Sequence, residues 1–271
     1  MEKIKYRAKT IDDYFIVEGL CGIAQLEKES KSKESWFLVG GIAVQSYLPS
    51  SCRRPTSDID LALLVPLNYE SFKEYSKPVK EYLQDKGFQV EEKKGHNTFI
   101  LKYKKDEETG VIEFARRNKQ NLKRIIKRLE EEMKNTRLKV IEGKREFYRV
   151  SSPEDIISPK MVRSIMILKE FPELKEEYLT KKIYPLTEKK IEESLNEIEK
   201  IKEEARLSEG NLEIACRLRF VSDIYDIKVL SELTGFNEDY LKESLYRWSK
   251  NREDSEEKNI LMKSLLPFIK I

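Results

Sequence analysis

The sequence is poor in the residues that define disulfide-bonded and zinc-binding proteins. Among 271 residues it has one histidine, His96, and three widely separated cysteines, Cys21, Cys52 and Cys216. An odd number of cysteines without metal-ligand spacing predicts neither a disulfide framework nor a zinc site. We therefore expect three ordinary thiols and a histidine in a loop.

Long hydrophobic runs are also missing. No stretch approaches the roughly 18 apolar residues that cross a bilayer, and the start, MEKIKYRAKTIDDYF, lacks the apolar core of a signal peptide. The sequence therefore predicts no membrane segment, and we expect a cytoplasmic location.

Charge is abundant instead. Charged residues make up 37% of the chain, against about 25% in a typical globular protein. Lys and Glu dominate, a bias typical of thermophile proteins. The segment from Arg116 to Arg149 is distinctly basic, which favours an RNA partner such as tRNA. A solvated helix face followed by a Lys-protected edge strand explains the same charges.

Helical and strand patterns alternate up to residue 150. Apolar spacing predicts helices at 12–30, 42–48, 68–86 and 119–134, and short apolar or alternating runs predict strands at 36–39, 59–65, 88–92, 98–103, 110–115, 137–141 and 146–150. Trp36 lies in one of these runs and is expected in the core. This mixture predicts an α/β or α+β domain built on one sheet.

Strand signals end at the sequence Ser-Ser-Pro-Glu that begins at Ser151. A capping Ser152 followed by Pro153 is a clear helix start. From there the pattern predicts only helices, at 154–170, 172–180, 187–207, 211–233, 237–250 and 254–269. We therefore predict two domains, 1–150 and 151–271.

Two adjacent glycines, Gly40 and Gly41, follow the strand at 36–39 and precede a helix. Because neither carries a Cβ, the backbone can turn sharply there and approach a ligand, and N–H groups at a helix start can bind phosphate oxygens. A tight strand-to-helix turn without a ligand explains the pair equally well.

Asp58 and Asp60 alternate where the strand at 59–65 begins, in the sequence SDIDLAL, with Asp58 directly before the strand. Period-2 geometry places both carboxylates on one face, where their repulsion requires a cation or protons. Mg²⁺ is a natural counter-ion because it prefers hard oxygen ligands and phosphates. The alternative is a strand start whose acids point into water.

Glu113 is an isolated acid in the otherwise apolar strand GVIEFA. If this strand lies beside the one that carries Asp60, Glu113 completes three acids that can hold metal ions for attack on an α-phosphate. A surface position on an edge strand is the ordinary alternative.

These motifs together resemble the polymerase-β-type nucleotidyltransferase superfamily. The stretch R-x-T-x-D-I-D-L from Arg54 resembles more narrowly its AbiEii branch, the nucleotidyltransferase toxins of type IV toxin–antitoxin systems. Two later stretches agree with that branch: SPEDIISPKMVRSI contains Lys160, and RFVSDIYDIKVL contains Asp223, Tyr225 and Asp226.

The resemblance implies an α+β fold, with a nucleotidyltransferase-type mixed sheet, flanking helices and an all-helical C-terminal domain. It also implies transfer of a nucleoside monophosphate from an NTP to an acceptor, either RNA or protein, in the presence of Mg²⁺ or Mn²⁺. A cognate antitoxin is a possible partner. The resemblance implies that three residues bind metal and are catalytic: Asp58, Asp60 and Glu113. It implies that five residues bind the triphosphate or the nucleotide: Gly40, Gly41, Arg54, Thr56 and Lys160. Asp226 and Asp223 would position Lys160 or the base.

The later residues also have ordinary explanations. Lys160 fits a surface lysine whose stem lies on apolar neighbours, and Asp223 fits an ion pair with Arg219 at helical spacing. Two other functions stay open: a small-molecule nucleotidyltransferase of the antibiotic-modifying kind, and a nucleotide- or RNA-binding module without catalysis.

Overall fold

The computed structural model describes residues 8–29, 32–174, 178, 187–208 and 210–249. The chain divides into two compact units, Met1–Ser46 with Arg53–Ser152 and Tyr47–Cys52 with Pro153–Ile271. The short segment Tyr47–Cys52 therefore belongs with the C-terminal unit, although it lies within the first predicted domain. The division into functional domains at residue 150 stays a prediction.

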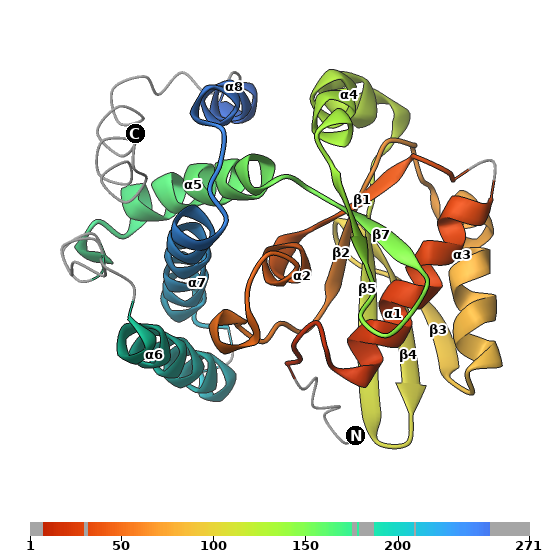
Figure 1. Cartoon of the computed structure of the whole chain (residues 1–271), viewed down its shortest axis with the longest axis horizontal. Coiled ribbons are helices and arrows are strands. Elements are labelled where there is room, and N and C mark those ends of the chain that lie inside the picture. Colours follow the sequence, from red (N-terminus) through yellow and green to blue (C-terminus); the bar gives the residue numbers. More distant parts are fainter. Residues whose placement is uncertain (1–7, 30–31, 175–177, 179–186, 209, 250–271) are drawn as a thin grey trace. The chain divides into compact units, whose positions relative to one another are not determined.

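The first unit contains a mixed sheet of seven strands among the described residues, in the order β3-β4-β5-β2-β1-β7-β6 (Figure 1). The β2–β5 and β1–β7 pairs are parallel and the other pairs are antiparallel. The strands are β1 Trp36–Val39, β2 Ile59–Leu63, β3 Gln89–Lys94, β4 Thr98–Lys105, β5 Glu108–Ala115, β6 Arg137–Val140 and β7 Phe147–Val150. With the helices described below, this sheet confirms the predicted α+β class.

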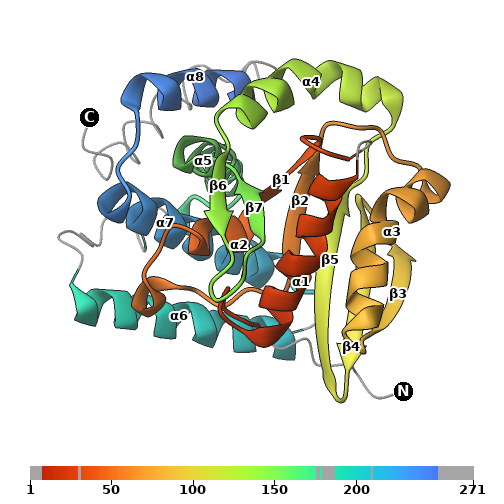
Figure 2. The same cartoon turned by 45° about the vertical axis from the view of Figure 1, so that its right-hand side comes forward.

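One face of the sheet is covered by α1 (Tyr14–Ala24) and α3 (Tyr69–Asp85), which lie side by side in front of the strands in Figure 2. Gly19 of α1 lies so close to the sheet that a Cβ there would meet the Ile59 side chain and the Tyr103 hydroxyl. Tyr103 is buried and donates its hydroxyl to the Phe15 carbonyl at 2.7 Å. This contact fixes α1 on the face to which Ile59 points.

The opposite face carries α4 (Lys119–Lys134) and the short helix α2 (Gly40–Gln45). Leu122 and Leu129 of α4 pack on Phe37 of β1 and Ala62 of β2, which alternate with the residues that face α1. Asp60 is two residues from Ala62 and therefore lies on the α4 side of the sheet.

Several boundaries differ from the predicted ones. The helix expected to begin at residue 42 begins at Gly40, directly after β1. Residues 104–109, which lie between the predicted strands 98–103 and 110–115, are mostly strand, and Asp106 and Glu107 form the turn. The strand β4 tolerates lysine at both of its last positions. Lys104 is exposed to water, because alternate strand positions face away from the core. The ammonium of Lys105 lies 5.3 Å from the centre of the Phe88 ring.

The second unit consists of helices in its described residues, α5 Pro153–Glu170, α6 Glu188–Leu207, α7 Leu212–Leu233 and α8 Glu238–Ser249, with the short 3₁₀ helix Ser50–Cys52. The central helix α7 is continuously buried from Phe220 to Leu230 and packs against α5 and α6. Of the predicted helices, 254–269 lies outside the described residues, as does most of 172–180.

Among the helices of the described ranges, none has both the length and the apolar content required to span a bilayer. The three cysteines are free thiols, of which Cys21 and Cys52 are buried. Trp36 is fully buried, as its apolar surroundings in the sequence predict.

Candidate functional site

The three predicted acids come together on adjacent strands of the first unit. β2 and β5 are parallel neighbours whose register pairs Asp60 with Glu113, and Asp58 lies just before β2 begins. One carboxylate oxygen from each of the three residues lies within 4.8 Å of the other two. Glu113 was predicted to complete the set only if its strand lies beside the strand of Asp60. The pairing of β2 with β5 meets this condition.

Their setting explains why the cluster favours a cation. All three residues are half-buried, so their charges are only partly screened by water. Burial raises the pKa of Glu113 above its usual value and the Asp58 carboxylate raises it further, whereas a hydrogen bond from Thr98 lowers it. Three carboxylate oxygens this close are the hard donors that Mg²⁺ or Mn²⁺ takes, so the residues fit a divalent metal ion.

Gly40 packs directly on this cluster. Its φ of +72° is a left-handed conformation that side chains rarely adopt. A Cβ at Gly40 would lie 2.0 Å from Oδ2 of Asp60, which is closer than any non-bonded contact allows. The backbone therefore approaches the chain's own carboxylate at the point where the sequence predicted approach to a ligand.

Gly41 and Thr56 form the adjoining contact. A Cβ at Gly41 would meet Oγ1 of Thr56 at 2.8 Å. The same hydroxyl donates a hydrogen bond to Oδ1 of Asp58 at 3.2 Å. Thr56, predicted as a nucleotide contact, thus orients one of the acids, and the absence of a side chain at Gly41 makes room for it.

The loop that bears Arg54 is held by buried polar contacts. The side chain of Gln45, 1% exposed, donates to the Arg54 carbonyl at 2.8 Å and accepts from the Ile11 N–H at 2.8 Å. Lys9 and Thr56 form an antiparallel bridge beside it. These contacts therefore fix the backbone of Arg54. Its side chain is half-buried, and the residue lies in the loop that leads to Asp58.

The remaining predicted residues form a second cluster within the helical unit. Nζ of Lys160 in α5 donates to Asp223 at 3.0 Å and to Asp226 at 2.9 Å, both in α7. Arg163, one turn after Lys160, holds Asp223 with two hydrogen bonds of 2.7 Å. Two cations and two carboxylates thus form one network between α5 and α7.

This network excludes the ordinary explanations given above for Lys160 and Asp223, whereas their functional roles stay predictions. Lys160 is 5% exposed and therefore is not a surface lysine. Both oxygens of Asp223 are engaged by Arg163 and one of them also by Lys160, so a simple pair with Arg219 is the wrong explanation. Tyr225, between the two aspartates, donates its hydroxyl to the Cys52 carbonyl at 2.9 Å.

Sequence reasoning missed three contributors, namely Arg163, Thr98 and Gln45. Arg163 had a detectable signal, since it follows Lys160 at the i,i+3 spacing that places both on one helix face. Thr98 and Gln45 had none, because their partners Glu113 and Arg54 become neighbours only through the strand order and the loop path.

Comparisons with known proteins give a distant structural likeness. No protein-family model matches the chain, and no curated protein matches it. Among solved structures it is similar to the crystal structure of an antigenic nucleotidyltransferase-like protein from Paracoccidioides brasiliensis, at 14% identity and a TM-score of 0.43 over 94% of this chain and 94% of that chain.

Proposed function

We propose that the protein is a metal-dependent nucleotidyltransferase, which moves a nucleoside monophosphate from an NTP to an acceptor. The observation that carries the proposal is the set of three carboxylates from the β2 and β5 region, with oxygens within 4.8 Å of one another. Gly40 supports it, because the left-handed turn and its contact with Asp60 hold one carboxylate in place.

The proposed reaction is an in-line displacement at phosphorus. The acceptor hydroxyl oxygen bonds to the α-phosphorus, the bond from that phosphorus to its bridging oxygen breaks, and pyrophosphate leaves. Asp58 and Asp60 hold the divalent ion, which when bound offsets the charge of the triphosphate. Glu113 completes the acidic set and takes the proton of the acceptor hydroxyl.

Other residues are assigned to the triphosphate. Arg54 suits a phosphate because a guanidinium presents a fork of N–H donors, and its loop is fixed by Gln45. Lys160 is assigned a phosphate contact through the ammonium that Asp223 and Asp226 hold in a single orientation. Gly40 and Gly41 are assigned to the turn that faces the nucleotide.

The proposed acceptor is RNA, with a transfer RNA as the first candidate. Arg116, Lys119, Lys123 and Lys127 are exposed, and the three lysines recur at i,i+4 along α4. Like charges at this spacing repel one another. The sequence between Arg116 and Arg128 contains no acidic residue that would offset this repulsion. A row of cations on a helix that starts six residues after Glu113 suits the phosphate backbone of a nucleic acid. A toxin-like role with a cognate antitoxin, as in the AbiEii branch, is part of this proposal.

The deciding experiment is label transfer. Incubation with Mg²⁺ or Mn²⁺, each NTP labelled on the α-phosphate, and total tRNA should transfer label to RNA. Asp58→Asn, Asp60→Asn and Glu113→Gln should each lower the rate by at least about 100-fold, because they remove charge without changing shape. Glu107→Gln, in the exposed β4–β5 turn, is the matched control.

Transfer that survives the loss of Asp58 and Asp60 would contradict the assigned site. Nucleotide binding without transfer to RNA, protein or small molecules would support a binding module instead. For the acceptor, the double variant Lys123→Glu with Lys127→Glu should weaken RNA binding and reduce its salt dependence, whereas Lys73→Glu with Lys77→Glu, a pair at the same spacing on α3, should not.

A further inference from the structure

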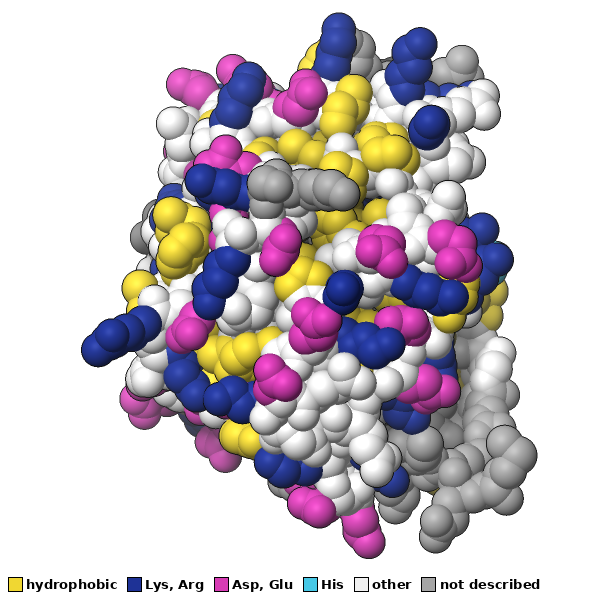
Figure 3. Space-filling model, turned by 90° about the vertical axis from the view of Figure 1, so that its right-hand side faces the viewer, with side chains coloured by type: hydrophobic (Ala, Val, Ile, Leu, Met, Phe, Trp, Pro, Cys, Tyr) yellow, Lys and Arg dark blue, Asp and Glu magenta, His cyan; other side chains and the backbone are white. Residues whose placement is uncertain are grey.

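The surroundings of Lys160, to which a phosphate contact is assigned above, differ from those of a surface lysine. On the face seen in Figure 3, where α3 and β3 lie in Figure 1, basic and acidic side chains are intermingled. Lys80 of α3, for example, pairs with Glu92 at 2.8 Å while its side chain stays 32% exposed, so water can accept its other hydrogen bonds. Lys160 is only 5% exposed, so its ammonium depends mainly on acceptors that the protein or a ligand supplies.

The protein supplies two of those acceptors. An ammonium group has three N–H donors. Nζ of Lys160 donates to Oδ1 of Asp223 at 3.0 Å and to Oδ2 of Asp226 at 2.9 Å. The part of the chain that the structure describes offers Lys160 no third acceptor. One donor of a buried ammonium is therefore available to an oxygen of a ligand, such as a phosphate oxygen.

The direction of that donor depends on how Asp223 is held. Arg163 donates from Nε to Oδ2 and from Nη2 to Oδ1 of Asp223, both at 2.7 Å. Two bonds between a guanidinium and a carboxylate fix the plane of the carboxylate as well as its position. Because Lys160 uses the same Oδ1, Arg163 determines where this acceptor lies for the ammonium.

Arg163 also affects the charge that a ligand meets at Lys160. Asp223 and Asp226 are almost fully buried, so water screens their charges poorly. With Arg163 present, two carboxylates face two cations, and their formal charges sum to zero. Without Arg163 the ammonium alone faces both carboxylates, and one negative charge is left over. That charge repels an anionic ligand at the short distances of this network.

Attachment of α5 to α7 does not by itself explain the network. Buried ion pairs are weak evidence for stability, because the loss of hydration offsets much of their attraction. The two helices pack against each other and also bury apolar side chains, among them Met161 in α5 and Ile224 in α7. The Arg163 side chain is 41% exposed, so the network extends from the interior to the surface of the helical unit, where a ligand can approach.

We propose that Arg163 is a positioning residue for nucleotidyl transfer. Through Asp223 it orients the ammonium of Lys160 and keeps the positive charge of that ammonium available for a phosphate oxygen of the NTP. Arg163 acts through Lys160 and does not contact the nucleotide. The inference rests on the proposed function, because it takes the phosphate contact of Lys160 from it.

A double-mutant cycle on the full chain tests this role, with α-phosphate-labelled NTP, Mg²⁺ and total tRNA. Arg163→Met should lower kcat/KM for the NTP by about 10- to 100-fold, the loss expected when a contacting group is misplaced. In the Lys160→Met background the same change should have less than about a twofold effect, because the group through which Arg163 acts is gone. Arg219→Met removes an exposed arginine of α7 and is the matched control, with less than about a twofold effect.

Arg163→Lys separates charge from geometry. Lysine keeps the positive charge but cannot form the two-bond fork, so kcat/KM should fall by about tenfold while the fold persists, as a thermal unfolding scan will check. If Arg163→Met does not fold, Arg163→Lys takes its place in the cycle.

The position of the ammonium can also be measured without activity. The lysine ammonium signal that Lys160→Met removes from a two-dimensional proton–nitrogen NMR spectrum belongs to Lys160. This signal should shift or broaden in Arg163→Met and in Arg163→Lys, and should stay unchanged in Arg219→Met.

Two results would overturn the inference while the proposed function stands: transfer that Arg163→Met lowers equally with and without Lys160, or an ammonium signal that neither Arg163 variant changes. Absence of transfer by the unmodified chain would contradict the proposed function, and this inference with it.

Discussion

Gly40 combines a left-handed backbone with direct contact to a carboxylate, which makes its substitution a test of the site's geometry. We expect Gly40→Ala to lower the free energy of unfolding by about 3 kcal/mol, since alanine adds the clash with Asp60 to the cost of a positive φ. Gly87 is the matched control: its φ is +83°, and nothing lies within 4 Å of an added Cβ. Gly87→Ala should cost only about 1 kcal/mol in urea denaturation. Equal losses would show that the contact with Asp60 does not constrain position 40.

Lys228 is an ionisable side chain almost fully buried in α7. It is 1% exposed, and burial lowers its pKa from the usual 10.5 to about 7. Between those two values the unfolded chain binds a proton that the folded chain does not, so the free energy of unfolding should rise with pH by up to about 1.4 kcal/mol per pH unit. Lys228→Met should flatten this rise and should stabilise most at pH 7 and below.

Denaturant titrations from pH 6 to about pH 10 measure this effect, with Lys104→Met at an exposed position as the control. A pH profile of Lys228→Met that is parallel to that of the unmodified chain would show that Lys228 stays charged in the folded state.

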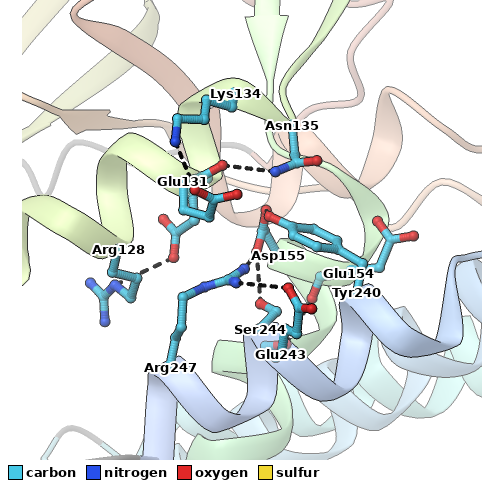
Figure 4. Close-up of polar contacts among 12 residues, drawn as sticks. Arg128, Glu131, Lys134, Asn135, Glu154, Asp155, Tyr240, Glu243, Ser244 and Arg247 are labelled. Atoms are coloured by element: carbon cyan, nitrogen blue, oxygen red, sulfur yellow. Dashed lines mark hydrogen bonds and ion pairs between the residues drawn. The ribbon is translucent and has the colours of Figure 1, made fainter.

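At the scale of elements, α8 is attached to α5 through one buried carboxylate. Asp155, 4% exposed, accepts hydrogen bonds from three side chains of α8: Tyr240 at 2.7 Å, Ser244 at 2.6 Å and Arg247 at 3.4 Å (Figure 4). Next to it, Glu154 accepts the backbone N–H of Asn237 at 2.7 Å, just before the helix begins.

Because the amide of asparagine replaces one acceptor by a donor, we expect Asp155→Asn to leave buried hydroxyls unsatisfied and to cost about 2 to 4 kcal/mol. Amide hydrogen exchange should show the loss first in α8. Asp239→Asn is the control, since that side chain is exposed and its ion pair with Lys242 spans 3.7 Å. Protection of α8 that is the same in both variants would contradict the attachment role.

Local patterns predicted most elements, and the reason lies in how they form. The strand at Trp36–Val39 and the helix at Lys119–Lys134 depend on periodicity and caps that neighbouring residues supply, so sequence alone specified them. The acid cluster needed one fact that sequence does not contain, the parallel adjacency of β2 and β5 across about fifty residues. Likewise, only the folded chain shows that Arg163 and Lys160 share Asp223.

At the scale of the whole molecule, the path of the chain couples its two units. The segment Tyr47–Cys52 belongs to the helical unit, although residues on both sides of it belong to the sheet unit. Tyr225 fixes this segment through its hydrogen bond to the Cys52 carbonyl. The chain therefore passes between the units at three points, and Asp58 follows six residues after the segment.

The two tryptophans allow this coupling to be measured, because Trp36 lies in the sheet unit and Trp248 in the helical unit. We expect Trp36→Phe and Trp248→Phe, each of which leaves one fluorescent probe, to give coincident urea transitions, since the backbone crosses between the units at three points. Tyr225→Phe should lower both midpoints together, by a loss of about 1 kcal/mol for a buried hydrogen bond. Exposed Tyr246→Phe in α8 is the control and should change neither. Midpoints that separate, or a Tyr225→Phe effect confined to the Trp248 signal, would show that the units unfold independently despite the shared segment.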